Sequence, residues 1–144
     1  MCEIVKNVRN SETLRKSFNK LAKETFDLDF EDWYQNGFWR DKYIPYSMVI
    51  DGEVAANVSV NRTDMLWNGR RKHLIQLGTV MTKETYRNRG LIRRLMEEIA
   101  KDFATEADGI YLFANDSVLD FYPKFGFRKA VEWQYSKKIS AWGE

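Results

Sequence analysis

The chain has 144 residues, 44% of them hydrophobic and 15% aromatic, so it is long and apolar enough to bury a core and is not disordered. We expect one domain over residues 1–144. The net charge of +2 is too small to indicate a nucleic-acid partner, and the apolar runs are too short for a membrane span, so we expect neither nucleic acid nor a membrane as a partner.

The cysteine and histidine content excludes two further classes of site. With one cysteine, Cys2, and one histidine, His73, neither an intramolecular disulfide nor a zinc site is expected, and we predict no metal. The N-terminal residues contain no apolar leader segment. A free thiol in a chain without a leader predicts a cytoplasmic protein.

The first part of the chain predicts a strand followed by two helices. Residues 3–8 are typical of a short strand. Ser11 is a suitable N-cap for a helix over residues 12–26, whose apolar residues recur at helical spacing. Residues 30–39 are rich in aromatic side chains and predict a second, shorter helical or irregular segment.

The middle of the chain predicts an antiparallel meander of three strands. The dipeptides Asp51-Gly52 and Asn68-Gly69 favour the positive φ angles of two-residue hairpin turns. Within the second strand, apolar residues alternate with Ala55, Asn57, Ser59 and Asn61, so one face of the strand is apolar. The three predicted strands cover residues 43–50, 54–67 and 73–82.

The remainder predicts a helix, a strand, a short helix and a last strand. The first of these helices has an apolar stripe that consists of Leu91, Ile92, Leu95, Met96, Ile99, Ala100 and Phe103. The later segments cover residues 109–115, 117–126 and 127–138. The element order is therefore β-α-α-β-β-β-α-β-α-β, which predicts an α/β fold with a mixed central sheet and helices on both faces.

Positive charge gathers where residues 83–90 lead into the helix that starts at Leu91. The positive end of the helix dipole lies there, so clustered arginines at this point indicate an anion. Unpaired N–H groups and a glycine make such a turn a suitable phosphate site, and the alternative is a solvated basic helix start. The spacing matches neither a P-loop nor the dinucleotide-binding fingerprint.

Two motifs carry a family resemblance. Arg87-Asn88-Arg89-Gly90-Leu91-Ile92 resembles the R/Q-x-x-G-x-G/A loop of GNAT N-acetyltransferases, which in that family holds the pyrophosphate of acetyl-CoA. The segment from Asn115 to Phe127 resembles the family's N-x-x-A-x-x-x-Y-x-x-x-G-F segment. The order of predicted elements matches the GNAT fold, and the run from Arg87 to Met96 most resembles the N-terminal domain of enhanced-intracellular-survival (Eis) type acetyltransferases.

The resemblance implies direct acetyl transfer from acetyl-CoA to an amine. Ile92 departs from the family pattern, and its larger side chain would either narrow the approach to the pantetheine or turn toward the core. The pantetheine would lie along the strand before the loop, which faces the strand over residues 110–114. The implied cofactor-binding residues are Val80, Met81, Thr82, Arg87, Asn88, Arg89, Gly90, Leu91, Ile92 and Asn115.

The resemblance also implies a general acid, Tyr122, which would give its proton to the departing CoA thiolate. A phenol with a pKa of about 10 is still protonated at neutral pH. The alternative is a packing aromatic side chain. Asn115 would either bond the pantetheine or cap the following helix. The general base lies in no motif, and the candidates are Glu31, Asp32, Asp64 and His73.

The aromatic segment before the first hairpin is the candidate acceptor pocket. Together with its acidic residues Glu31, Asp32 and Asp41, it would suit a cationic amine through charge attraction and cation–π contacts. The alternative is that the aromatic rings cap the core over the sheet. The candidate pocket residues are Trp33, Tyr34, Phe38 and Trp39, with Tyr43 beside them.

Two hypotheses concern assembly and activity. Family members commonly end in a hairpin, but residues 127–144 have room for one strand and a stub, so the last family strand is expected to be missing. The alternatives are an exposed sheet edge, pairing across a homodimer and the loss of a C-terminal extension. Because an open edge is usually covered, our hypothesis is a homodimer through this region. The leading function is an acetyl-CoA-dependent N-acetyltransferase acting on a small-molecule or peptide amine, and the alternative is a non-catalytic acyl-CoA-binding or sensing domain.

Overall fold

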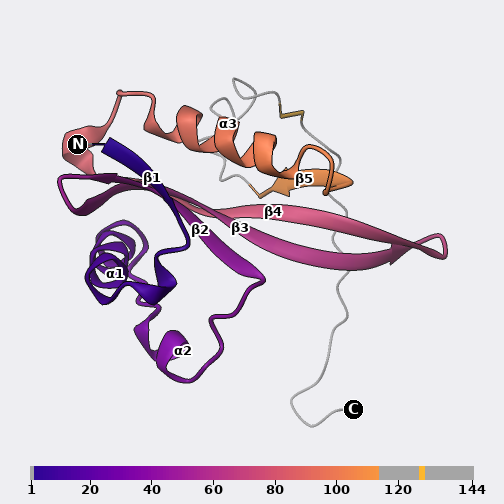
Figure 1. Cartoon of the computed structure of the whole chain (residues 1–144), viewed down its shortest axis with the longest axis horizontal. Helices are drawn as coiled ribbons and strands as arrows, with labels where there is room; N and C mark the ends of the chain where they lie inside the picture. Colours follow the sequence, from indigo (N-terminus) through magenta and orange to yellow (C-terminus); the bar gives the residue numbers. More distant parts are fainter. Residues whose placement is uncertain (1, 114–126, 129–144) are drawn as a thin grey trace, which may run out of the picture. The chain divides into compact units, whose positions relative to one another are not determined.

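The computed structural model describes residues 2–113 and 127–128, and within them the predicted element order is confirmed (Figure 1). Two short 3-10 helices, η1 and η2, add to the predicted elements. The predicted helix over residues 117–126 lies outside the described residues, as does the last strand beyond Arg128. The elements are β1 Cys2–Lys6, η1 Val8–Asn10, α1 Glu12–Phe26, α2 Glu31–Gln35, β2 Tyr43–Ile50, β3 Glu53–Trp67, β4 Arg70–Thr82, η2 Glu84–Tyr86, α3 Leu91–Phe103 and β5 Gly109–Leu112.

The five strands form one mixed sheet in the order β1-β2-β3-β4-β5. The first three pairings are antiparallel and β4 pairs with β5 in parallel, as the α3 crossover requires. Both predicted hairpin turns are confirmed, because Asp51 and Gly52 have φ angles of 51° and 80°, and Asn68 and Gly69 have φ angles of 50° and 76°. The meander is thus encoded locally by its turn residues.

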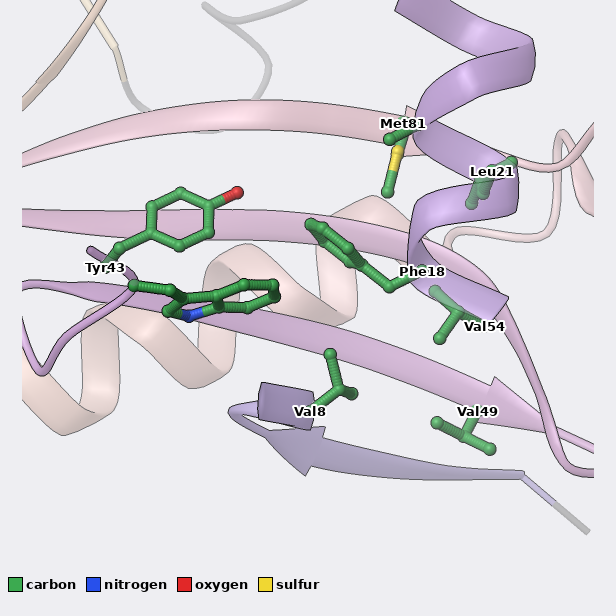
Figure 2. Packing of buried hydrophobic residues seen from close by; sticks show 9 residues of the cluster. Val8, Phe18, Leu21, Tyr43, Val49, Val54 and Met81 are labelled. Atoms are coloured by element: carbon green, nitrogen blue, oxygen red, sulfur yellow. The ribbon is translucent and has the colours of Figure 1, made fainter. Parts of the chain in front are cut away.

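Helix α1 covers one face of the sheet. Its N-terminus begins where Ser11 is predicted to cap it, and the Leu14 N–H donates to the Ser11 hydroxyl at 3.3 Å. Phe18 has no exposed surface and reaches from α1 onto the sheet beside Tyr43 and Val54 (Figure 2). Met81 of β4 belongs to the same cluster, so this core reaches the end of the strand that precedes the arginine-rich loop.

Helix α3 covers the opposite face (Figure 1). Its predicted apolar stripe is buried except at Ala100, which is exposed because it lies at the edge of the helical stripe. The Tyr46 hydroxyl of β2 donates to Asp102 at 2.7 Å, and Lys6 of β1 bonds the same carboxylate at 2.8 Å. The sheet is therefore covered by helices on both faces. No helix in the described part of the chain has the length and apolar character for crossing a membrane.

Candidate functional site

The C-terminal part of β4 extends beyond its partner β5. The parallel pairing runs from Leu74 with Gly109 to Leu77 with Leu112, whereas β4 continues to Thr82. Within residues 2–113 and 127–128, residues 78, 81 and 82 pair with β3 on one side, and none of residues 78–82 pairs with a strand on the other. This edge can bind an extended ligand through its backbone groups. The predicted pantetheine residues Val80, Met81 and Thr82 lie on it.

A β-bulge interrupts β4 at the same place. Ser59 of β3 pairs with Gly78 and Asn57 pairs with Met81, so Thr79 and Val80 together face the single residue Val58. Thr79 has a φ of +47°, a left-handed conformation that β-branched residues rarely adopt. Such strain persists only where surrounding contacts stabilise it.

A buried chain of polar side chains contacts the bulge on the face of the sheet that α1 covers. The members from β2 and β3 are almost fully buried. Asn57 accepts from the Ser47 hydroxyl at 2.8 Å and donates to the Ser59 hydroxyl at 2.9 Å and to the Thr79 carbonyl at 3.0 Å. Ser59 donates to the Tyr43 hydroxyl at 2.8 Å, and a further 2.8 Å hydrogen bond joins the hydroxyls of Tyr43 and Thr79.

The sequence interpretation found the apolar face of β3 but assigned no role to Asn57 or Ser59. The alternation of residues along β3 predicts that Asn57 and Ser59 lie on the polar face of the strand, but α1 buries that face. The available signal was a pair of small polar residues at alternate positions of a strand that is otherwise apolar. Such groups, when buried, require hydrogen-bond partners.

The loop after β4 turns sharply into α3. Asn88 and Gly90 have φ angles of 64° and 71°, and the second of these is the N-cap of α3. The N-cap residue Gly90 has no side chain that could cap this helix N-terminus, and the first turn contains no acidic residue. The N–H groups of the first helical turn and the positive end of the helix dipole therefore favour an anion at this place.

Arg87 and Arg89 present unpaired positive charge beside this N-terminus. Both are exposed, and neither has an acidic partner among the described residues. The Arg87 Nε lies 3.4 Å from the Thr82 carbonyl oxygen, and the Arg89 guanidinium lies 5.1 Å from the centre of the Tyr86 ring. Two unpaired arginines at an uncapped helix start are suited to a phosphate group.

Leu91 and Ile92 both turn into the protein core. Their exposed fractions are 6% and 9%. Of the two alternatives for Ile92, the structure therefore shows the one in which the side chain packs in the core. The departure from the family pattern adds volume beneath the loop and not at its outer surface.

The aromatic segment around α2 packs mainly against the core. Trp39 is 3% exposed, its ring centre lies 5.5 Å from that of Phe18, and Trp33 and Tyr34 are partly buried against the same cluster. Phe38 is 61% exposed. Trp39 therefore belongs to the core, which is the second alternative for this segment, and the Phe38 ring is the one that solvent reaches most.

Two acidic residues of the segment already have basic partners. Glu31 accepts from the Arg15 Nε at 2.7 Å, and Asp41 accepts from Arg9 at 3.3 Å. The hydrogen bond from Arg15 holds the pKa of the Glu31 carboxyl below its usual value. A carboxylate held in this way is a weaker base, so Glu31 is suited to a structural role. Asp32 is exposed.

The other two candidate bases, His73 and Asp64, form a pair on the long β3–β4 hairpin. His73 Nδ1 lies 2.5 Å from Asp64 Oδ1, and this hydrogen bond lowers the pKa of the Asp64 carboxyl. A strand advances about 3.3 Å per residue, so His73 lies roughly 20 Å along β4 from Val80. The pair is therefore remote from the bulge. Tyr122 and Asn115 lie outside the described residues.

Comparisons with known proteins agree on one class. Residues 9–130 match the model of the acetyltransferase (GNAT) domain. No curated protein matches the chain by sequence. A predicted acetyltransferase from Clostridium acetobutylicum, solved with acetyl-CoA, has a TM-score of 0.73 at 15% identity, covering 95% of this chain and 96% of that one.

Two further solved structures are similar over nearly the whole chain. An aminoglycoside acetyltransferase from an uncultured soil metagenomic sample has a TM-score of 0.68 at 17% identity, covering 97% of this chain and 99% of that one. Glucosamine-6-phosphate N-acetyltransferase from Arabidopsis thaliana has a TM-score of 0.67 at 15% identity, with the coverage again 97% and 99%. At such low identity these likenesses establish a shared fold.

Proposed function

The chain belongs to the acetyltransferase (GNAT) family, and on that premise we propose that it transfers the acetyl group of acetyl-CoA to a primary amine of a small molecule or peptide. One observation carries the proposal: the uncapped N-terminus of α3, with Arg87 and Arg89 unpaired among the described residues, directly follows the β4 edge that β5 leaves open. The likeness to Eis-type domains stays a prediction.

The open β4 edge and the loop divide the binding of acetyl-CoA between them. Residues 87–92 take the pyrophosphate, through backbone N–H groups at Gly90 and beyond and through the two arginines. Val80, Met81 and Thr82 hold the pantetheine along the edge of β4. We assign Asn115, which lies outside the described residues, to a hydrogen bond with the pantetheine.

Transfer proceeds in one step within the ternary complex. The amine nitrogen attacks the thioester carbonyl carbon, the C–N bond forms and the C–S bond breaks. A backbone N–H of β4 stabilises the negative charge that develops on the carbonyl oxygen. Tyr122 protonates the leaving thiolate, and the proton of the attacking amine passes to solvent water.

The acceptor binds against the aromatic segment before β2. Phe38, which is 61% exposed, and the exposed carboxylate of Asp32 offer an aromatic face and a negative charge to an ammonium group. The partly buried rings of Trp33 and Tyr34 form the floor. Two structural neighbours are named as an aminoglycoside acetyltransferase and as glucosamine-6-phosphate N-acetyltransferase, and both names support a primary amine as the acceptor.

Calorimetric titration with acetyl-CoA tests the cofactor site. We expect micromolar binding by the wild type and about 100-fold weaker binding by the Arg87→Glu/Arg89→Glu variant, because two attractive contacts become repulsive. The matched control is Arg70→Glu/Arg71→Glu, which changes the net charge equally at exposed positions at the other end of β4. A folded wild type that does not bind acetyl-CoA, or equal losses in both variants, would contradict the proposed site.

The Tyr122→Phe variant separates the enzyme from the alternative, a domain that binds acyl-CoA without transferring the acetyl group. Loss of the general acid should lower kcat by about 100-fold, while the Kd for acetyl-CoA stays within about threefold of the wild type. Release of CoA thiol, measured across a panel of amines, gives kcat. A wild type that binds acetyl-CoA but releases no thiol with any amine would favour the binding domain.

A further inference from the structure

Side chains from two other strands form hydrogen bonds with Thr79 at the bulge of β4. Its carbonyl accepts from Asn57 Nδ2 at 3.0 Å, and its hydroxyl is joined to the Tyr43 hydroxyl at 2.8 Å. Thr79 is therefore held at both its backbone and its side chain, by residues from two different strands. These contacts act on the residue whose φ of +47° is strained for threonine.

One consistent assignment of donors and acceptors satisfies all the hydrogen bonds of this network. Ser47 donates to Asn57, which uses both amide N–H groups, one on the Ser59 hydroxyl and one on the Thr79 carbonyl. Ser59 donates to Tyr43, which leaves the Tyr43 proton for the Thr79 hydroxyl. Every step of this chain leads toward Thr79, so the bulge is where the buried polar network ends.

An apolar core would be simpler to pack than this network. Asn57, Ser47 and Ser59 have no exposed surface, and burying their polar groups costs free energy that hydrogen bonds only offset. The network instead fixes the conformation of β4 at the bulge, where the strand departs from regular pairing with β3. Burial also raises the pKa of the Tyr43 hydroxyl, so it stays a proton donor at neutral pH.

We infer that Asn57 and Tyr43 are positioning residues for acetyl transfer, which hold the Thr79 bulge so that the backbone of Val80 and Met81 faces the thioester. This inference rests on the proposed function, since it assigns the bulge to the thioester. Neither side chain touches the reacting atoms. They act through Thr79, whose rotation toward an ordinary extended φ would move the following N–H groups.

The experiment compares Asn57→Ala with Asn19→Ala, a matched control. Asn19 is also a buried asparagine, and its side chain accepts from a backbone N–H, that of Phe30, at 3.0 Å. In Asn57→Ala we expect the backbone chemical shifts of Thr79 and Val80 to move toward extended values. We also expect kcat to fall about tenfold or more while the Kd for acetyl-CoA stays within about threefold. Asn19→Ala should leave the Thr79 shifts unchanged.

Two further variants complete the test. Tyr43→Phe keeps the buried ring and removes only the hydroxyl, so it should move the same chemical shifts and lower kcat about threefold. This variant therefore tests the inference even if Asn57→Ala does not fold. Glycine adopts a positive φ without strain, so in a Thr79→Gly background the loss from Asn57→Ala should shrink to about threefold.

The outcomes separate this inference from the proposed function. Unchanged Thr79 shifts in Asn57→Ala and Tyr43→Phe would overturn the positioning role. Equal kcat losses from Asn57→Ala in the wild type and in the Thr79→Gly background would overturn it as well. A wild type without transfer activity would instead refute the enzyme, and the chemical shifts would still decide whether the two side chains hold the bulge.

Discussion

The ion pair between Arg15 and Glu31 offers a test that separates structure from catalysis. Arg15 donates to Glu31 through Nε at 2.7 Å and Nη2 at 3.4 Å, its guanidinium lies 3.8 Å from the Tyr34 ring centre, and its side chain is 8% exposed. Glu31, whose side chain is 34% exposed, also accepts from Gln35 at 2.9 Å. The pair joins α1 to the aromatic segment, so Glu31→Gln should destabilise the fold.

The magnitude follows from the burial of the pair. Exposed pairs contribute about 0–1 kcal/mol, whereas removing one partner of a fully buried pair costs about 3–5 kcal/mol. Since Glu31 is partly solvated, we expect Glu31→Gln to lower the free energy of unfolding by about 2 kcal/mol, or Tm by about 4–8 °C. Glu12→Gln is the control, because Glu12 and Lys16 form an exposed pair with side chains 70% and 73% exposed, and its effect should stay below about 0.5 kcal/mol.

The pH dependence has a defined sign. Arg15 lowers the pKa of Glu31 in the folded state, so its contribution is fully present above the unfolded pKa of about 4.3 and is lost as pH falls through the folded value. In urea titrations between pH 3 and 7, the difference between wild type and Glu31→Gln should be constant above about pH 5 and shrink below about pH 4.

Activity provides the second measurement on the same variant. Under conditions where both proteins are folded, Glu31→Gln should keep kcat within about threefold of the wild type, because Glu31 serves as the counterion of Arg15. A general base would instead cost about 100-fold or more and remove a limb of the pH–rate profile. That second result, or an unfolding free energy equal to the wild type, would refute the structural assignment of Glu31.

Two more predictions concern the core and the loop. Phe18→Ala should lower the free energy of unfolding by about 3–5 kcal/mol in urea titration, because it empties the centre of a buried cluster, whereas Phe26→Ala, at a side chain 42% exposed, should cost less than about 1 kcal/mol. Gly90→Ala should weaken acetyl-CoA binding about fivefold in calorimetry, because φ there is +71°. Gly37→Ala, with a φ of +76° and equally open surroundings, should lower stability by a similar amount and leave the affinity for acetyl-CoA unchanged. Equal losses of stability in the phenylalanine pair, or equal losses of affinity in the glycine pair, would count against these assignments.

Signals between neighbouring residues determined the local elements of this protein from its sequence. Ser11 caps α1 through a contact three residues away, and the dipeptides at 51–52 and 68–69 form the turns that their φ preferences predict. The apolar stripe of α3 predicted its buried face, apart from Ala100. The resemblance of residues 87–92 and of the segment from Asn115 indicated the family, which the domain model confirms.

Contacts between distant residues were decided only by the tertiary structure. Alternation along β3 predicted one apolar face, but only the packing of α1 buries Asn57 and Ser59 on the other face, and only strand pairing brings Thr79 to them. The bulge itself has no local signal, since threonine disfavours the φ it adopts. Such features depend on which strands pair and in which register, and that choice is made by the whole core at once.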